Sequence, residues 1–258
     1  MNLAGIGFAE FAPAAYGEVL FLALVAFLGS VVFGITGFGS ALITIPLATH
    51  VVPLPFALGL FVLMDLANAA RVGCENPKHA LRAEWMRMVP MIVAGTVAGV
   101  TLLVNLPRQI ATLALGVFVI AFALYTLFKR ADSLARLGTG WAWAAGFAGG
   151  VTSTVFGAGG PPYAMYLSQR GLTKEQYRAT LGFAALSSIS LRTLAFLATG
   201  ILLDARVWWY AAAVVPGGLL GLWAAGHIFR RISREALMRA VAMMLLASGA
   251  SLVLRSLA

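Results

Sequence analysis

The sequence has few charged residues, because Asp, Glu, Lys and Arg make up 10% of its 258 residues. An ordinary soluble domain carries about 25%, and a chain of this size exposes too much surface in water for so few charges to cover. Its single cysteine, Cys74, excludes a disulfide framework and a cysteine metal cluster. The three histidines lie far apart, with no helical pair spaced for zinc. We therefore expect neither a metal nor a cofactor.

Hydrophobic residues, by contrast, make up 61% of the chain, and the mean hydropathy is +0.92. Between Glu18 and Asp65 lie 46 residues without one charged side chain. Further uncharged runs cover 88–107, 109–128, 137–169 and 207–229. Each reaches the roughly 20 apolar residues that cross a bilayer as a helix. The sequence therefore predicts an all-α polytopic protein of the lipid bilayer, with one membrane domain over residues 1–258.

The net charge of +9 raises the question of nucleic-acid binding. The basic residues, however, stand in short groups at the ends of the apolar runs, which is typical of membrane proteins. We expect no nucleic-acid partner.

The apolar residues fall into eight segments, of which the first and the fifth are too long for one crossing. Glycine interrupts these two at 34–40 and at 157–162, where helix propensity collapses. We predict that both are broken or re-entrant. The eight predicted segments are 17–50, 54–70, 85–104, 109–128, 141–169, 176–199, 207–226 and 236–254.

The two interrupted segments also match each other in sequence. Phe27 and Gly29 align with Phe147 and Gly149 at a shift of 120, and later echoes follow at shifts of 123 and 126. Three echoes in the same order predict two homologous halves of four apolar segments, over residues 17–130 and 141–256.

The distribution of Lys and Arg predicts how the two halves are oriented. Eight plain crossings would divide the basic loop residues nine to eight, with no bias between the two sides. If the first and fifth segments enter and leave on one side, the division becomes fourteen to three, with Arg108, Arg206 and Arg255 as the minority. Such a bias is what the positive-inside rule requires. We favour this inverted repeat, with both termini facing away from the cytoplasm, over the plain alternative.

Two helix breaks at equivalent places indicate a transport site. Backbone outside a helix is tolerated within a bilayer only where protein or a wet cavity surrounds it, and matched breaks mark transporter sites. Helix restarts present free N–H groups that favour an anion. Close helix packing is the alternative role for the glycines. The candidate substrate-binding residues at the breaks are Thr36, Gly37, Gly39, Ser40, Thr154, Gly157, Gly159 and Gly160.

Arg192 is the one basic residue deep in an apolar segment. A cation at that depth costs a few kcal/mol and should face a cavity or a partner. Its guanidinium suits two-pronged binding of an oxyanion. A buried ion pair with Asp65 and snorkelling to the interface are the alternatives. Asp65 could also carry a proton or bind a cation, and Asn68 shares its helix face at i+3, as a further candidate for the substrate site.

The motif Gly34-Ile-Thr-Gly37-Phe-Gly39-Ser40 and its echo Gly157-Ala-Gly159-Gly160-Pro161-Pro162 resemble the sulfite exporter TauE/SafE family. The likeness covers about residues 18–255 and extends to Pro90 and Pro216 with the glycines that follow them. It implies a bacterial inner-membrane transporter of small anions, typically sulfite or organosulfonates. The first half has Phe38 and Ser40 where the second has Ala158 and Gly160, so the resemblance does not imply equal roles for the two breaks.

The sequence thus favours a multi-pass secondary transporter that exports small sulfur-containing oxyanions. It holds no Walker A pattern for direct use of ATP. An anion channel is the alternative, and a membrane-embedded enzyme is a weaker one, because the spans hold no paired acids or Ser/Lys dyad. We do not expect an enzyme. The anion, the coupling ion, the direction of flux and a homodimer remain open.

Overall fold

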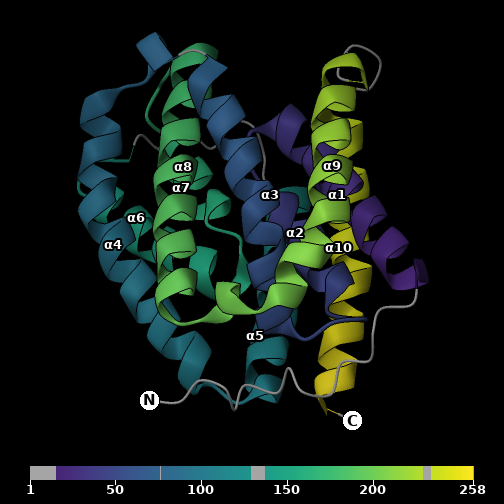
Figure 1. Ribbon diagram of the computed structural model, residues 1–258. Helices are drawn as coiled ribbons and strands as arrows, with labels where there is room; N and C mark the ends of the chain where they lie inside the picture. The colour runs from purple at the N-terminus through teal and green to yellow at the C-terminus, as the bar shows by residue number, and fades with distance from the viewer. Residues whose placement is uncertain (1–15, 76, 129–136, 229–233, 258) are drawn as a thin grey trace.

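The computed structural model describes residues 16–75, 77–128, 137–228 and 234–257, and all secondary structure within these ranges is helical (Figure 1). This confirms the all-α prediction. Five of the basic residues in the charge argument, at 129, 130, 136, 230 and 231, lie outside the described residues. The first half contains α1 (Tyr16–Thr36), α2 (Ser40–Ala48), α3 (Leu54–Glu75), η2 (Pro77–His79), α4 (Arg82–Asn105) and α5 (Arg108–Phe128). The second contains α6 (Trp141–Phe156), α7 (Gly160–Ser168), α8 (Lys174–Ala198), η3 (Ile201–Leu203), α9 (Ala205–Ile228) and α10 (Arg234–Leu257).

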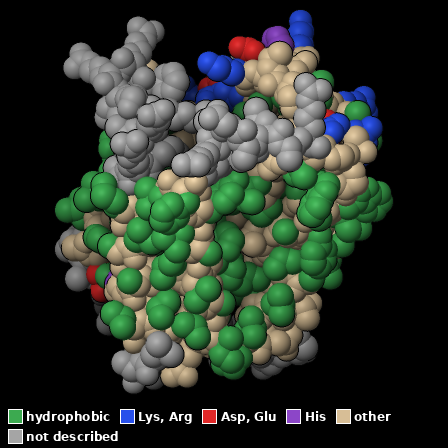
Figure 2. All heavy atoms as spheres, turned by 180° about the vertical axis from the view of Figure 1, so that it is seen from behind, with side chains coloured by type: hydrophobic (Ala, Val, Ile, Leu, Met, Phe, Trp, Pro, Cys, Tyr) green, Lys and Arg blue, Asp and Glu red, His purple; other side chains and the backbone are tan. Residues whose placement is uncertain are grey.

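Six of the described helices are long and apolar enough to cross a membrane: α1, α3, α4, α5, α8 and α9. Large apolar side chains on their outer faces are exposed, among them Leu20, Val97 and Leu220. Figure 2 shows such side chains as a broad band around the middle of the molecule, with Lys and Arg gathered at the upper end. The chain is therefore a multi-pass membrane protein whose apolar band faces lipid.

The helix interruptions lie in the glycine stretches singled out in the sequence. α1 ends at Thr36 and α2 begins at Ser40, and α6 ends at Phe156 and α7 begins at Gly160. Each pair folds back on itself, and we call α1–α2 the first hairpin and α6–α7 the second hairpin. Within the first, a Cβ at Gly29 would lie 3.1 Å from the carbonyl oxygen of Ser40. Because α2 is buried along nearly its whole length, protein rather than lipid surrounds the broken backbone.

Glycines allow the longer helices to approach closely. α1 packs on α9, α6 packs on α4, α3 packs on α8, and α5 packs on α10. A Cβ at Gly95 of α4 would overlap the carbonyl of Phe147, and one at Gly221 of α9 would overlap the carbonyl of Phe27. Small residues at such crossings are the usual device for helix packing in membranes, and here they press each hairpin against a helix of the other half.

The α3–α4 and α7–α8 connections lie together at one end of the bundle. Arg178, at the start of α8, pairs with Glu75 at the end of α3 at 3.1 Å. The backbone N–H of Leu81 donates to the Thr180 hydroxyl at 2.9 Å. The connections α3–α4 and α7–α8 therefore lie at the same end, and Figure 1 shows the α4–α5 and α8–α9 connections at the opposite end.

Candidate functional site

The tips of the two hairpins meet inside the protein. Gly37 and Gly39 at the first tip and Gly157 at the second have left-handed backbone, with φ of 82°, 91° and 74°. Only glycine takes this conformation without strain. A Cβ at Gly160 would lie 2.5 Å from the Cβ of Phe38, so the two breaks are in direct contact.

A small buried pocket lies where the tips meet. Its volume of about 20 Å³ holds one or two water molecules. The first hairpin contributes Phe33, Phe38, Gly39, Ser40 and Ala41 to its wall, and α3 contributes Asp65. The remaining wall comes from the second hairpin and α8. These other lining residues include Ser153, Gly157, Gly159, Gly160, Tyr163, Ala185, Ser188 and Ile189.

Two short helices begin at this pocket. α2 begins at Ser40 and α7 begins at Gly160, and no side chain caps either N-terminus. Uncapped N–H groups, together with the positive end of the helix dipole, stabilise an anion. In α7 the second and third residues are Pro161 and Pro162, which have no N–H to offer. The first hairpin therefore presents more backbone donors to the pocket than the second.

Asp65 and Arg192 form a buried ion pair beside the pocket. Their side chains are 2% and 1% exposed, and the Nη2–Oδ2 distance is 2.8 Å. Arg192 Nη1 also donates to the carbonyl of Ser153 at 2.9 Å, and Ser40 Oγ donates to Asp65 Oδ1 at 2.5 Å. The pair thus connects α3 and α8 to the tips of both hairpins. In this conformation Arg192 makes the ion pair that the sequence offered as the alternative to substrate contact.

Of the residues proposed from sequence, Gly39, Ser40, Asp65, Gly157, Gly159 and Gly160 line the pocket, and Arg192 bonds to its wall. Four others do not line it. Thr36 caps its own loop by donating to the Phe38 carbonyl, Gly37 faces Leu181, and Thr154 donates to the Gly150 carbonyl. Asn68 donates to Ser30 at 2.8 Å in a separate contact between α3 and α1.

Gly159 has a packing role in addition to its place in the wall. A Cβ there would lie 2.8 Å from both the Gly149 carbonyl oxygen and the Ser153 Cβ. The second hairpin therefore closes only around glycine at this position. By contrast, a Cβ at Gly39 would meet nothing closer than Leu42 at 3.6 Å. Of the two alternatives that the sequence left open, close packing therefore accounts for Gly159 but not for Gly39.

Two wall residues with hydroxyl groups were not identified from the sequence. Tyr163 and Ser188 are fully buried, and both line the pocket. Ser188 lies 123 residues after Asp65, which is the shift of the second sequence echo. Extending that echo along α3 and α8 would have placed Ser188 opposite Asp65.

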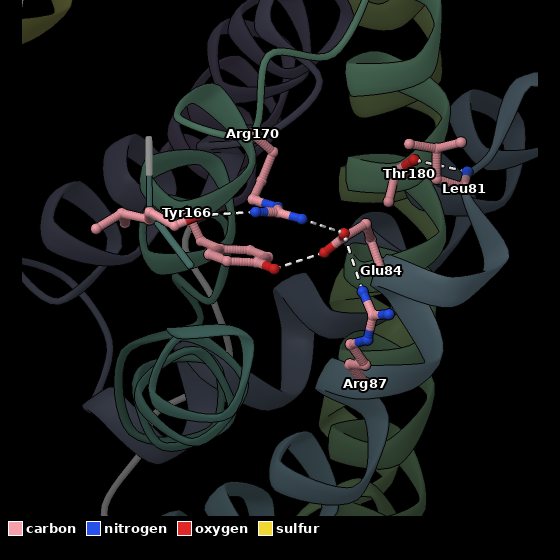
Figure 3. Close-up of polar contacts among 7 residues, drawn as sticks. Leu81, Glu84, Arg87, Tyr166, Arg170 and Thr180 are labelled. Atoms are coloured by element: carbon pink, nitrogen blue, oxygen red, sulfur yellow. Dashed lines mark hydrogen bonds and ion pairs between the residues drawn. The ribbon is translucent and has the colours of Figure 1, made fainter. Parts of the chain in front are cut away.

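A cluster of polar side chains holds the second hairpin at its base (Figure 3). Glu84 of α4 accepts from Tyr166 at 2.5 Å, from Arg170 at 2.8 Å and from Arg87 at 3.1 Å. Arg170 also donates to the carbonyl of Leu137, just before α6. Glu84 therefore fixes both ends of the hairpin to α4. No group of three His, Cys, Asp or Glu that could hold a metal occurs among the residues described.

An all-helical membrane bundle in which two interrupted helices meet at a central pocket is the architecture of a membrane transporter. The family described as "Sulfite exporter TauE/SafE" matches residues 22–252, and the chain belongs to this family. This confirms the resemblance identified in the sequence.

Two relatives carry names that describe transporters. The "Probable sulfite/organosulfonate exporter TauE" of Cupriavidus necator is 29% identical over 190 residues, which cover 70% of this chain and 73% of that protein. The "Probable inner membrane transporter protein TsaS" of Comamonas testosteroni is 25% identical over 195 residues, covering 75% and 81%. No solved structure matches the chain.

Proposed function

We propose that the protein is a secondary transporter that exports small sulfur-containing oxyanions, such as sulfite or organosulfonates, across the bacterial inner membrane. The observation that carries the proposal is the convergence of two uncapped helix N-termini, α2 and α7, on one buried pocket. Paired N-termini favour an anion over a cation or a neutral solute. The names of the two relatives support sulfite or organosulfonate as the anion, export as the direction and the inner membrane as the location.

The contact between the two tips favours a carrier over an anion channel. With Phe38 against Gly160 and a pocket of about 20 Å³, the anion needs a rearrangement of the tips at each step. Transport by such a carrier saturates and supports counter-transport, whereas flux through a channel does not require either.

The pairing of helices supports an inverted repeat. α1 packs on α9 as α6 packs on α4, and each crossing places a glycine against the carbonyl of an equivalent phenylalanine. Eight plain crossings would place the α3–α4 and α7–α8 connections on opposite sides, whereas Arg178 and Glu75 join them. Each half would then cross three times, and both termini would face away from the cytoplasm. Labelling of cysteines at positions 4 and 256 by an impermeant reagent in a Cys74→Ser background tests this, and protection of both would contradict it.

Uptake into proteoliposomes tests the function. The purified chain, reconstituted alone, should take up sulfite with saturation kinetics, and preloaded unlabelled sulfite should accelerate entry of labelled sulfite. Methanesulfonate should compete, while choline and glucose should not. Sulfite flux equal to that of protein-free liposomes would contradict the proposal, and flux without saturation would favour a channel.

A further inference from the structure

Two buried hydroxyl groups on the pocket wall have no hydrogen-bond partner other than each other within the described residues. The side chains of Tyr163 and Ser188 are 0% and 1% exposed, and neither hydroxyl makes a well-formed hydrogen bond within the described residues. The two side chains are neighbours, and both line the pocket. A buried polar group without a partner in the protein is costly, and of the described hydroxyl groups in this position only these two line the pocket. Two together on the wall of one pocket indicate groups held ready for a ligand.

The surrounding structure fixes both groups in place. Gly149 of α6 leaves room for the ring of Tyr163, because a Cβ at this position would overlap the ring. Ser188 stands one helical turn before Arg192 on α8, and Arg192 bonds to Asp65 and to the Ser153 carbonyl. A donor held by packing in its binding orientation loses little entropy when the ligand arrives.

The hydroxyl groups also compensate for donors that α7 lacks. Pro161 and Pro162 remove two N–H groups from its first turn, whereas α2 has a full set after Ser40. In the first half of the chain, the residue equivalent to Ser188 is Asp65. Its carboxylate is already bonded to Ser40 and Arg192. An ionised Asp65 has no hydrogen to donate, so at this position only the second half, through Ser188 with Tyr163 beside it, offers a neutral donor to the pocket.

We propose that the hydroxyl groups of Tyr163 and Ser188 donate hydrogen bonds directly to the transported anion and select for a three-oxygen –SO₃ group. The inference rests on the proposed function. Two oxygens of the group would accept from the N-termini of α2 and α7, and the third would accept from the hydroxyl pair. A planar carboxylate has only two oxygens and leaves the pair unsatisfied. Sites with buried donors discriminate strongly against ligands that lack the matching acceptor.

The test measures sulfite uptake, competition by methanesulfonate and acetate, and thermal unfolding in detergent for the full chain. Tyr163→Phe and Ser188→Ala should each raise the KM for sulfite by about ten-fold or more, the loss typical of one hydrogen bond to a charged group. The preference for methanesulfonate over acetate should fall as the KM for sulfite rises. Ser188→Thr keeps the hydroxyl and should retain most of the affinity. Since neither hydroxyl bonds to any other part of the described protein, the melting temperature should change little in either variant.

Tyr210→Phe and Ser248→Ala are matched controls. Both remove a buried hydroxyl group that also lacks a partner among the described residues, and neither lines the pocket. They should leave the KM for sulfite unchanged. An unchanged KM and an unchanged preference in Tyr163→Phe and Ser188→Ala would overturn the inference while leaving the proposed function intact. A wild-type protein that transports no sulfur oxyanion would instead contradict the proposed function itself.

Discussion

At the level of single residues, the charge balance beside the pocket depends on Arg192. Asp65 is the one acidic residue that lines the pocket, and Arg192, at 2.8 Å, neutralises it. Without Arg192, the uncompensated carboxylate would both destabilise the fold, by about 3–5 kcal/mol, and repel the anion. We therefore expect the ion pair to have two separable roles, one in stability and one in binding.

A double variant separates these roles. Arg192→Ala should abolish sulfite uptake and lower the melting temperature, and adding Asp65→Ala should recover much of the stability, because no charge is left unpaired. We expect sulfite binding to remain lost in the double variant, since no other cation bonds to the pocket wall within the described residues. Binding titrations on folded protein in detergent measure this. Binding restored to the wild-type level would show that Arg192 serves the ion pair alone.

The glycines at the hairpin tips allow a second residue-level prediction. At Gly39 only the backbone conformation excludes a side chain, because φ is 91° and a Cβ would find open space apart from Leu42. Gly39→Ala should therefore cost about 1–2 kcal/mol, and Gly39→Asn should cost less, since asparagine tolerates left-handed backbone.

Gly157 is the matched control for Gly39. Its φ is 74°, but a Cβ there would also lie 2.9 Å from the Cβ of Ala41 and 3.1 Å from Nη1 of Arg192. Gly157→Asn should therefore be at least as harmful as Gly157→Ala. Thermal unfolding in detergent compares the four variants. Equal losses for Asn and Ala at position 39 would show that the backbone conformation is not the constraint there.

The sequence was enough to predict the two helix breaks and to identify Arg192 and Asp65 as candidate site residues. It did not predict the direction in which each hydroxyl group points. Thr36 and Thr154 lie beside the breaks in sequence, yet both donate to backbone carbonyls of their own hairpins. Tyr163 and Ser188 reach the pocket because α7 and α8 have a particular rotation about their axes. That rotation is set by contacts between segments, such as the Tyr163 ring on Gly149, and not by local sequence.

At the level of elements, Glu84 joins α4 to the second hairpin. Its carboxylate accepts from Tyr166 at the end of α7 and from Arg170 just beyond, and Arg170 holds the Leu137 carbonyl before α6. Between this cluster and the pocket, α4 and α6 pack closely where Gly95 of α4 meets the backbone of α6. α4 and the second hairpin therefore form one unit, which positions the N-terminus of α7.

Glu84→Gln should loosen this unit without changing the pocket. The neutral amide keeps its shape but loses the charge that faces Arg170 and Arg87. Because both arginines are partly exposed, we expect a loss on the order of 1–2 kcal/mol. Thermal unfolding should show this loss, and faster hydrogen exchange should appear in residues 160–168. Arg178→Gln, which removes the exposed pair with Glu75, is the control and should leave that exchange unchanged. Equal exchange in wild type and Glu84→Gln would contradict the role of the cluster.

Hydropathy located the helices well but misjudged several ends. Segment 54–70 was predicted to stop before Arg71, whereas α3 continues to Glu75. A helix needs no apolar residues once it leaves the bilayer, because its backbone bonds are internal, and Arg178 pairs with Glu75 at the extended end. The two partners of Glu84 in the second hairpin, Tyr166 and Arg170, lie more than 80 residues away, so no local pattern identified that cluster.

At the level of the whole molecule, the two hairpin tips close the pocket from both halves. Phe38 from the first tip rests against Gly160 of the second, and the ion pair of Asp65 and Arg192 lies beside them. The volume of about 20 Å³ suffices for one or two waters, less than an anion of four heavy atoms needs. If the anion binds here, we therefore expect the tips to separate when it enters.

A reversible cross-link between the tips tests this expectation. In a Cys74→Ser background, Phe38→Cys with Gly160→Cys removes the phenyl ring that a side chain at position 160 would meet. The two Cβ atoms would start 2.5 Å apart, so the tips need to move apart by about 1 Å to reach the Cβ–Cβ distance of a disulfide. Oxidation should abolish sulfite uptake in proteoliposomes, and a reductant should restore it. Each single-cysteine variant should show the same sulfite uptake before and after oxidation. A fully cross-linked protein that transports at the rate of its reduced form would show that the anion passes without separation of the tips.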